Sequence, residues 1–168
     1  FRFIQGLDAG INRTVWGPDG NLYAGGVGSG GNWRHEGRLW YALHRFEYNE
    51  KSTFEMLAVR AKSHGMEIEF TEPIAAGEIM TADGFEVQQF YYDATGDYGG
   101  PKLGEESLKI KSVNLSADRK KVFLEIPGIQ ENRVVYIHIA KPLRSENDQS
   151  LWSTETWYTM TKKPGGSP

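Results

Sequence analysis

The segments Val134-Val135-Tyr136-Ile137-His138-Ile139 and Lys121-Val122-Phe123-Leu124-Glu125-Ile126 decide the fold of this chain. Both alternate with a period of two residues, which indicates a β-strand with one buried face. The same period recurs in residues 66–70, 85–92 and 108–115, and turn-forming residues separate these segments. Short alternating strands at a spacing of about 8–12 residues predict an all-β fold with an antiparallel sandwich of immunoglobulin-like character.

The chain divides into two regions of different character. The first holds half of the 20 glycines. We predict a β segment like a partial propeller blade over residues 1–50, a β-sandwich module over 51–162 and a flexible tail over 163–168. Within the sandwich, we interpret residues 54–62 as a strand and expect residues 151–160 to add an edge or closing strand. Helix content is expected to be low.

Composition excludes several classes of protein. The 168 residues are 24% charged and 39% hydrophobic, which are ordinary values for a folded globular chain. A formal charge of −3 provides no basic surface for phosphates, so nucleic acid is not an expected partner. The absence of cysteine excludes disulfides, thiolate metal sites and a c-type haem attached to this chain. No apolar run is long enough to span a membrane.

The most specific phrase is Val15-Trp16-Gly17-Pro18-Asp19-Gly20-Asn21-Leu22-Tyr23-Ala24-Gly25-Gly26. Its Gly-Pro-Asp-Gly centre predicts a tight reversal between two strands, and the aromatic-rich residues 37–46 are expected to supply a third strand. In residue types and their order this segment resembles one blade of the six-bladed propellers of the soluble glucose and sorbosone dehydrogenase superfamily.

The resemblance extends to large secreted proteins of Bacteroidetes-type bacteria that join such a propeller to c-type cytochrome modules and end in a β-sandwich. It is carried by residues 6–13, 39–41, 50–56, 98–102 and 151–159. It implies that this chain is the C-terminal part of a secreted or periplasmic protein. The start at a residue other than Met likewise predicts either a processed chain or a piece of a longer one.

The resemblance also implies where a cofactor would lie. Propellers of this kind hold pyrroloquinoline quinone (PQQ) and calcium in a central channel built by every blade, so both are expected in the parent protein and neither in this chain alone. Arg13 is the residue expected to point into such a channel. The alternative is an Arg13 that is solvated or paired with Asp8 or Asp19. Catalytic residues stay unknown, because no general-base histidine can be identified.

The other polar motifs favour structural roles. The four histidines lack the spacing of a zinc site, and His138 is expected on a sheet face. No nucleophile elbow, phosphate loop or dinucleotide fingerprint occurs. Residues 25–31 are interpreted as a surface loop, and the acidic turn at 93–97 lacks the carboxylate spacing of a calcium loop. No metal site is therefore expected.

Aromatic residues in loops predict a second kind of site. Sugar rings pack their C–H faces on flat aromatic side chains while polar neighbours bond the hydroxyl groups. The carbohydrate-binding platform predicted on this basis consists of Trp33, Trp40, Tyr91 and Tyr98. Five other aromatic residues are expected to serve the core, namely Trp16, Tyr23, Phe70, Phe123 and Tyr136.

These observations favour a structural or accessory C-terminal fragment of a secreted sugar-dehydrogenase-like protein, not a complete enzyme. The expected partner is the remainder of the parent polypeptide or a second copy of the chain, because a partial blade leaves strand edges and apolar surface uncovered. The alternative is a carbohydrate-binding β-sandwich module with a glycan as its partner. A self-contained hydrolase has no supporting motif.

Overall fold

The computed structural model describes residues 4, 6–28, 37, 39–96 and 99–165. It contains two units, one within residues 2–51 and one that begins at Ser52, and each is described by itself below. The described residues form eleven β-strands, a single turn of 3₁₀-helix and no α-helix. The prediction of an all-β fold with little helix is confirmed.

The first unit is a three-stranded antiparallel sheet of β1 (Gly10–Trp16), β2 (Leu22–Val27) and β3 (Tyr41–Phe46), in that order. The predicted hairpin joins β1 to β2, and the Gly17 N–H closes it by donating to the Asn21 carbonyl oxygen at 2.8 Å. The prediction that a loop begins at Gly25 is wrong, because β2 continues to Val27. Gly26 is paired in the strand and is closely approached by Ala9, since a Cβ at Gly26 would lie 3.1 Å from the Ala9 Cβ.

The Asp19 carboxylate organises the hairpin turn. It accepts hydrogen bonds from the Asn21 side-chain amide at 2.9 Å and from the Tyr23 hydroxyl at 2.8 Å. These bonds favour the ionised form and lower the pKa of Asp19 to about 2. A side chain at Gly17 would displace this arrangement, since a Cβ there would lie 2.5 Å from both the Asp19 carboxylate and the Tyr23 ring. The Gly-Pro-Asp-Gly phrase thus encodes its own turn.

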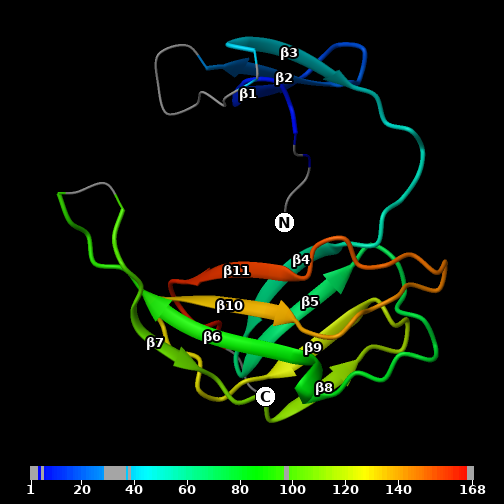
Figure 1. Ribbon diagram of the computed structural model, residues 1–168. Helices are drawn as coiled ribbons and strands as arrows, with labels where there is room; N and C mark the ends of the chain where they lie inside the picture. The colour runs from blue at the N-terminus through cyan, green and yellow to red at the C-terminus, as the bar shows by residue number, and fades with distance from the viewer. Residues whose placement is uncertain (1–3, 5, 29–36, 38, 97–98, 166–168) are drawn as a thin grey trace. The chain divides into compact units, whose positions relative to one another are not determined.

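The second unit consists of two four-stranded antiparallel sheets packed face to face, as Figure 1 shows. One sheet has the order β4-β5-β9-β8 and the other has the order β11-β10-β6-β7. The strands of the first sheet are β4 (Met56–Lys62), β5 (Gly65–Phe70), β9 (Lys121–Glu125) and β8 (Ser112–Leu115). Those of the second are β11 (Glu155–Met160), β10 (Arg133–Ile139), β6 (Phe85–Tyr91) and β7 (Leu103–Ser107).

The strand order is that of an immunoglobulin-like sandwich. With the strands lettered in chain order and β7 counted as an insertion after the third, the sheets read A-B-E-D and G-F-C, and β7 extends the second sheet next to its C strand. The first and last strands, β4 and β11, lie at the edges of different sheets. The predicted sandwich architecture is therefore present, with one added edge strand.

The strand β7 was missed because its sequence does not alternate. Residues 103–107 form an edge strand with both faces largely exposed, so there is no buried face to impose a period of two residues. The pairing with β6 is irregular between Gln89 and Tyr91. Gly104 has a φ of +56°, and a Cβ there would lie 2.7 Å from the Tyr91 ring. Glycine thus permits both the bulge and the close approach of Tyr91.

The core fills the space between the two sheets. Phe54 and Phe70 pack with ring centroids 5.4 Å apart, and Phe70 is buried as predicted. The core side chains that are almost wholly inaccessible include Met66, Ile68, Ile74, Val122, Leu124, Ile126, Val135, Ile137 and Met160. Trp16 was predicted to be structural core but is 71% exposed, because it lies at the end of β1 in the small sheet. Tyr23 and Phe123 are only half-buried.

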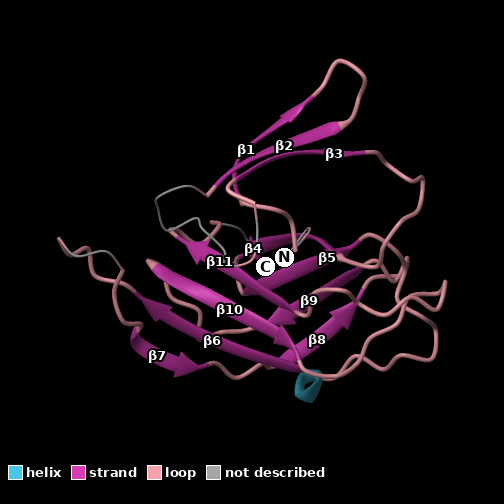
Figure 2. Ribbon diagram, turned by 45° about the horizontal axis from the view of Figure 1, so that its top comes forward, coloured by secondary structure: helices cyan, strands magenta, loops and turns pink. Residues whose placement is uncertain are grey.

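Two long connections meet at one end of the sandwich. Residues 71–84 end in the 3₁₀ turn Ala82–Gly84, the only helical segment in the described ranges, coloured cyan in Figure 2. Residues 140–154 run beside them, joined by a bridge between Ile74 and Ser145. The Arg119 guanidinium fixes the first connection by donating to the carbonyl oxygens of Ile74 and Ala75 at 2.7 and 2.5 Å. These contacts attach the first connection to the turn between β8 and β9.

Candidate functional site

The candidate site lies on the outer face of the sheet β11-β10-β6-β7. Alternation along β10 sends Val135, Ile137 and Ile139 into the core and leaves Tyr136 and His138 on the opposite face. The register places Trp157 of β11 and Gln88 of β6 directly opposite Tyr136, one on each side. Trp157, Tyr136 and Gln88 thus form a row across three strands, called here the central row.

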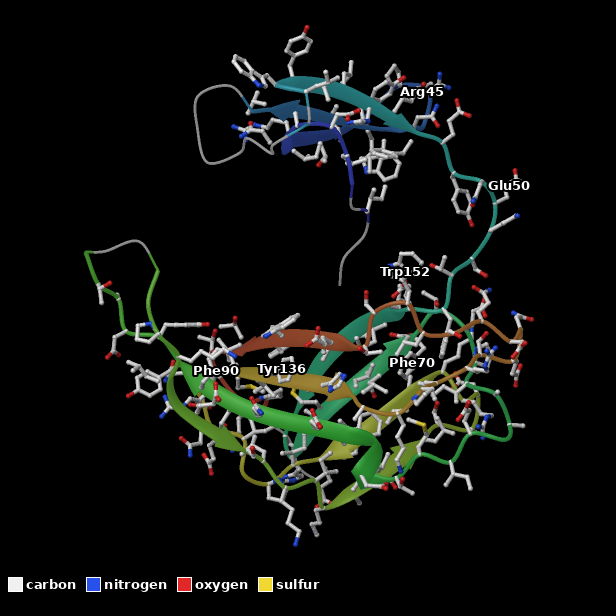
Figure 3. The ribbon with its side chains drawn as sticks, viewed as in Figure 1. Arg45, Glu50, Phe70, Phe90, Tyr136 and Trp152 are labelled. Carbon is white, nitrogen blue, oxygen red and sulfur yellow. The ribbon has the colours of Figure 1, made fainter. Side chains whose placement is uncertain are left out.

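The two aromatic rings of the central row are in contact. The centroids of Tyr136 and Trp157 lie 5.3 Å apart, with an angle of 42° between the ring planes. His138 lies two residues further along β10, stacked at 6.5 Å from the Tyr136 ring. Trp157 is 55% exposed, whereas Tyr136 and His138 are half-buried. Figure 3 shows Tyr136 on β10 and Phe90 on the neighbouring strand β6.

Carboxylates on the same face hold two of these rings. The Tyr136 hydroxyl donates to Glu155 Oε1 at 2.5 Å, and His138 Nδ1 lies 3.0 Å from Glu86 Oε2. Glu155 and Glu86 lie opposite His138 on its two sides, so the three residues form a polar row beside the central row. Partial burial and the hydrogen bond to Glu155 raise the pKa of Tyr136 to about 12. Its phenol therefore stays a neutral donor at physiological pH.

The other side of the central row is apolar and closed. Phe90 lies on the outer face opposite Val134, yet only 1% of it is exposed. Tyr92 packs on its edge at 5.5 Å, and the Lys102 ammonium lies 4.6 Å from its ring centroid. The face therefore has one covered end and one polar end, with the exposed aromatic surface between them.

Of the residues predicted for the carbohydrate platform, the structure describes Trp40 and Tyr91, which belong to different units. Trp40 is an exposed residue of the first unit, immediately before β3, and Tyr91 belongs to the second unit. The Arg133 guanidinium lies 4.4 Å from the Tyr91 ring centroid, so one face of that ring is occupied. Trp33 and Tyr98 lie outside the described residues. The platform stays a prediction.

Arg13, the residue predicted to face a cofactor channel, is exposed on β1. Its guanidinium donates to the carbonyl oxygen of its neighbour Asn12 at 3.0 Å. It lies opposite Gly25, on the same face of the small sheet as Val15. Its predicted role toward PQQ therefore stays a prediction.

The central row was missed by sequence reasoning, which placed Tyr136 in the core. Tyr136 is instead half-buried on the outer face of its sheet. A usable signal was present, since Tyr136 and His138 alternate with three aliphatic residues and must share the outer face. Trp157 could not be added from sequence, because its position opposite Tyr136 depends on the register set by the 140–154 connection.

Other parts of the sandwich contain pockets of modest size. A pocket of about 260 Å³ lies between Ile79, Phe85 and Leu143 at the end with the long connections. Another of about 260 Å³ lies at the opposite end and is lined in part by Lys62, Lys111 and Glu125. Two of its lysines have acidic partners, since Lys111 Nζ lies 2.7 Å from Glu125 and Lys62 Nζ lies 3.3 Å from Glu67.

Neither a metal cluster nor a membrane-spanning helix was found in the described ranges. No group of three or more His, Asp or Glu residues there is arranged to hold a metal ion. No helix in that part of the chain is long and apolar enough to cross a membrane.

The fold and the outer face define an immunoglobulin-like β-sandwich with an aromatic surface on one sheet. No family model matches the chain, and no curated protein matches its sequence. Among solved structures, the crystal structure of the S-layer protein rSbsC(31-844) is similar, with a TM-score of 0.49 and 14% sequence identity over 69% of this chain. The chain spans 15% of the length of that structure.

Proposed function

We propose that this chain is an accessory segment of a longer secreted sugar-dehydrogenase-like protein. The exposed face of the three-stranded sheet packs against the rest of that parent protein. The sandwich is an appended module. In this proposal, the PQQ and calcium chemistry belongs to the parent, and Arg13 lies on the surface that the parent covers. A second copy of the chain is the alternative cover.

The proposal rests on the uncovered face of the first sheet. Val15, Val27, Tyr41 and Leu43 are all exposed on one face of β1, β2 and β3. The opposite face carries Ala24, which is buried. A three-stranded sheet needs a packed apolar face for independent stability, and an exposed patch of this kind typically marks an interface.

Self-association tests whether this face binds apolar surface. We expect sedimentation velocity to show concentration-dependent association of the 168-residue chain, and Leu43→Glu to abolish it, because a buried carboxylate without a partner is costly. Ile79→Glu is the matched control, since Ile79 is equally exposed but belongs to the sandwich. A chain that stays monomeric at all concentrations, or that associates equally well with Leu43→Glu, contradicts the proposed interface.

The native gene product tests membership in the longer protein. We expect intact-mass measurement and the full reading frame to show a much longer polypeptide with further Gly-Pro-Asp-Gly blades and a Cys-x-x-Cys-His haem motif. A mature product of 168 residues overturns the proposal and leaves the sandwich surface as the leading functional feature.

A further inference from the structure

The outer face of the second sheet combines exposed aromatic side chains with polar side chains. The inference drawn from it below does not depend on the accessory role proposed above. Trp157 lies in the middle of the edge strand β11 and presents more than half of its surface to solvent. Such large aromatic side chains usually pack into a core or an interface, because burying their area is favourable. Here Tyr136 lies against Trp157 and extends the aromatic surface toward β6.

Polar groups that suit hydroxyl groups surround this aromatic surface. Glu155 and Glu86 each carry two acceptor oxygens. One oxygen of Glu155 accepts the bond from Tyr136, and one oxygen of Glu86 contacts His138. Gln88 offers both an acceptor and a donor beside the Tyr136 ring. Few side chains need to reorder on binding, because the contact between Tyr136 and Glu155 already fixes the ring.

The charge of the face selects among ligands. The nearest ionised groups of the polar row are the carboxylates Glu86 and Glu155. An acidic glycan would meet like charge at this end, which is unfavourable. A neutral glycan meets carboxylate acceptors for its hydroxyl protons, the Gln88 amide as donor and acceptor, and an aromatic face for its C–H groups.

We propose that Trp157 and Tyr136 form a binding site for a neutral oligosaccharide, with sugar rings stacked on the central row and hydroxyl groups bonded to Glu155, Glu86 and Gln88. Trp157 supplies most of the stacking surface because it is the most exposed of the three aromatic groups. Tyr136, on the neighbouring strand β10, contacts the Trp157 ring and extends the stacking surface.

Isothermal titration calorimetry of the full chain with cellohexaose, xylohexaose and N-acetylchitohexaose tests the site, with hexagalacturonic acid as the acidic counterpart. We expect at least one neutral hexasaccharide to bind saturably and the acidic one not to bind. Trp157→Ala should weaken binding about tenfold, the loss expected for one aromatic stacking contact. Trp157→Phe should restore part of the affinity.

Trp152→Ala is the matched control. Trp152 is 68% exposed in the same sandwich, and only its backbone N–H is bonded to Phe54, so its removal should leave both folding and binding unchanged. The proposal is overturned if none of the neutral hexasaccharides binds, if Trp157→Ala binds like the unaltered chain, or if the acidic hexasaccharide binds equally well. Failure here leaves the open face of the small sheet untouched, since that face belongs to the other unit.

Discussion

A single glycine determines how closely β5 approaches β9. Gly65 begins β5, and a Cβ at this position would lie 1.8 Å from the Leu124 carbonyl oxygen. The obstacle is backbone in a paired strand, so it cannot move aside as the tip of a flexible side chain can. No other residue type fits here without displacing the strand pair, although the φ angle of Gly65 is not in the left-handed region.

Gly65→Ala should therefore lower the free energy of unfolding by about 1–3 kcal/mol, the range found for overpacked sites. Gly77→Ala is the control, because nothing lies within 4 Å of a Cβ built there. Its effect should stay within about 0.5 kcal/mol, as for most surface substitutions. Urea denaturation of both variants measures the difference, and equal stability of the two would show that β9 yields to the methyl group.

At the scale of elements, two buried glutamates tie the start of the sandwich to its long connections. Glu72 follows β5 and accepts hydrogen bonds from the Ser52 hydroxyl and from the Gln149 amide, the latter at 2.8 Å. Hydrogen bonds from Ser145 and Ser52 lower the pKa of Glu72. Glu55 precedes β4, and burial raises its pKa, although a backbone hydrogen bond from Ser153 offsets part of this effect.

The two shifts predict opposite effects of removing the charge. A lowered carboxyl pKa adds stability that is present above the ordinary value of 4.5 and is lost as the pH falls below it. Glu72→Gln should lower the free energy of unfolding at pH 7 by about 1–3 kcal/mol and flatten its decline below pH 4.5. Glu55→Gln should raise the free energy at pH 7, because it removes a buried charge.

Chemical denaturation at pH 7 and at acidic pH compares the two glutamine variants directly. Glu72→Gln and Glu55→Gln make the same chemical change at two buried sites, so each is the control for the other. Shifts of the same sign at pH 7 would contradict the opposite roles assigned to these carboxylates.

The strands that could be predicted from sequence are those with one buried face. Residues 121–126 and 134–139 alternate because every second side chain is buried in the core. Residues 103–107 do not alternate, because neither face of that strand is buried. The long connections escaped prediction because their contacts are remote in sequence. Arg119, for example, bonds Ile74 across 45 residues. The aromatic site required the register of two strands separated by one of these connections.

At the scale of the whole molecule, the two units differ in how much apolar surface they bury. The core residues lie almost entirely in the sandwich, and Ser52 and Phe54 at its start are bonded or packed within it. Among the described residues of the first unit, only Ala9 and Ala24 belong to the buried apolar set. Regions with few buried apolar contacts open at lower free energy than well-packed ones.

Removal of residues 1–51 should therefore leave the sandwich folded, with a thermal midpoint close to that of its transition in the full chain. In the full chain, hydrogen exchange should be fast in β1–β3 and slow in β5, β9 and β10, because the latter strands are central in their sheets. Differential scanning calorimetry and amide exchange measure these expectations. A truncated chain that unfolds at a much lower temperature would show that the sandwich depends on the small sheet.

The placement of β4 and β11 has a mechanical consequence. The chain enters the sandwich near Ser52 and Glu72, and after β11 it reaches the other end, where Lys163 bonds Glu131. A pulling force applied to the two ends therefore acts lengthwise along β4 and β11, which belong to opposite sheets. Their ladders to β5 and β10 are loaded all at once in shear instead of being peeled bond by bond. A pull on its two ends is therefore resisted by many hydrogen bonds at the same time.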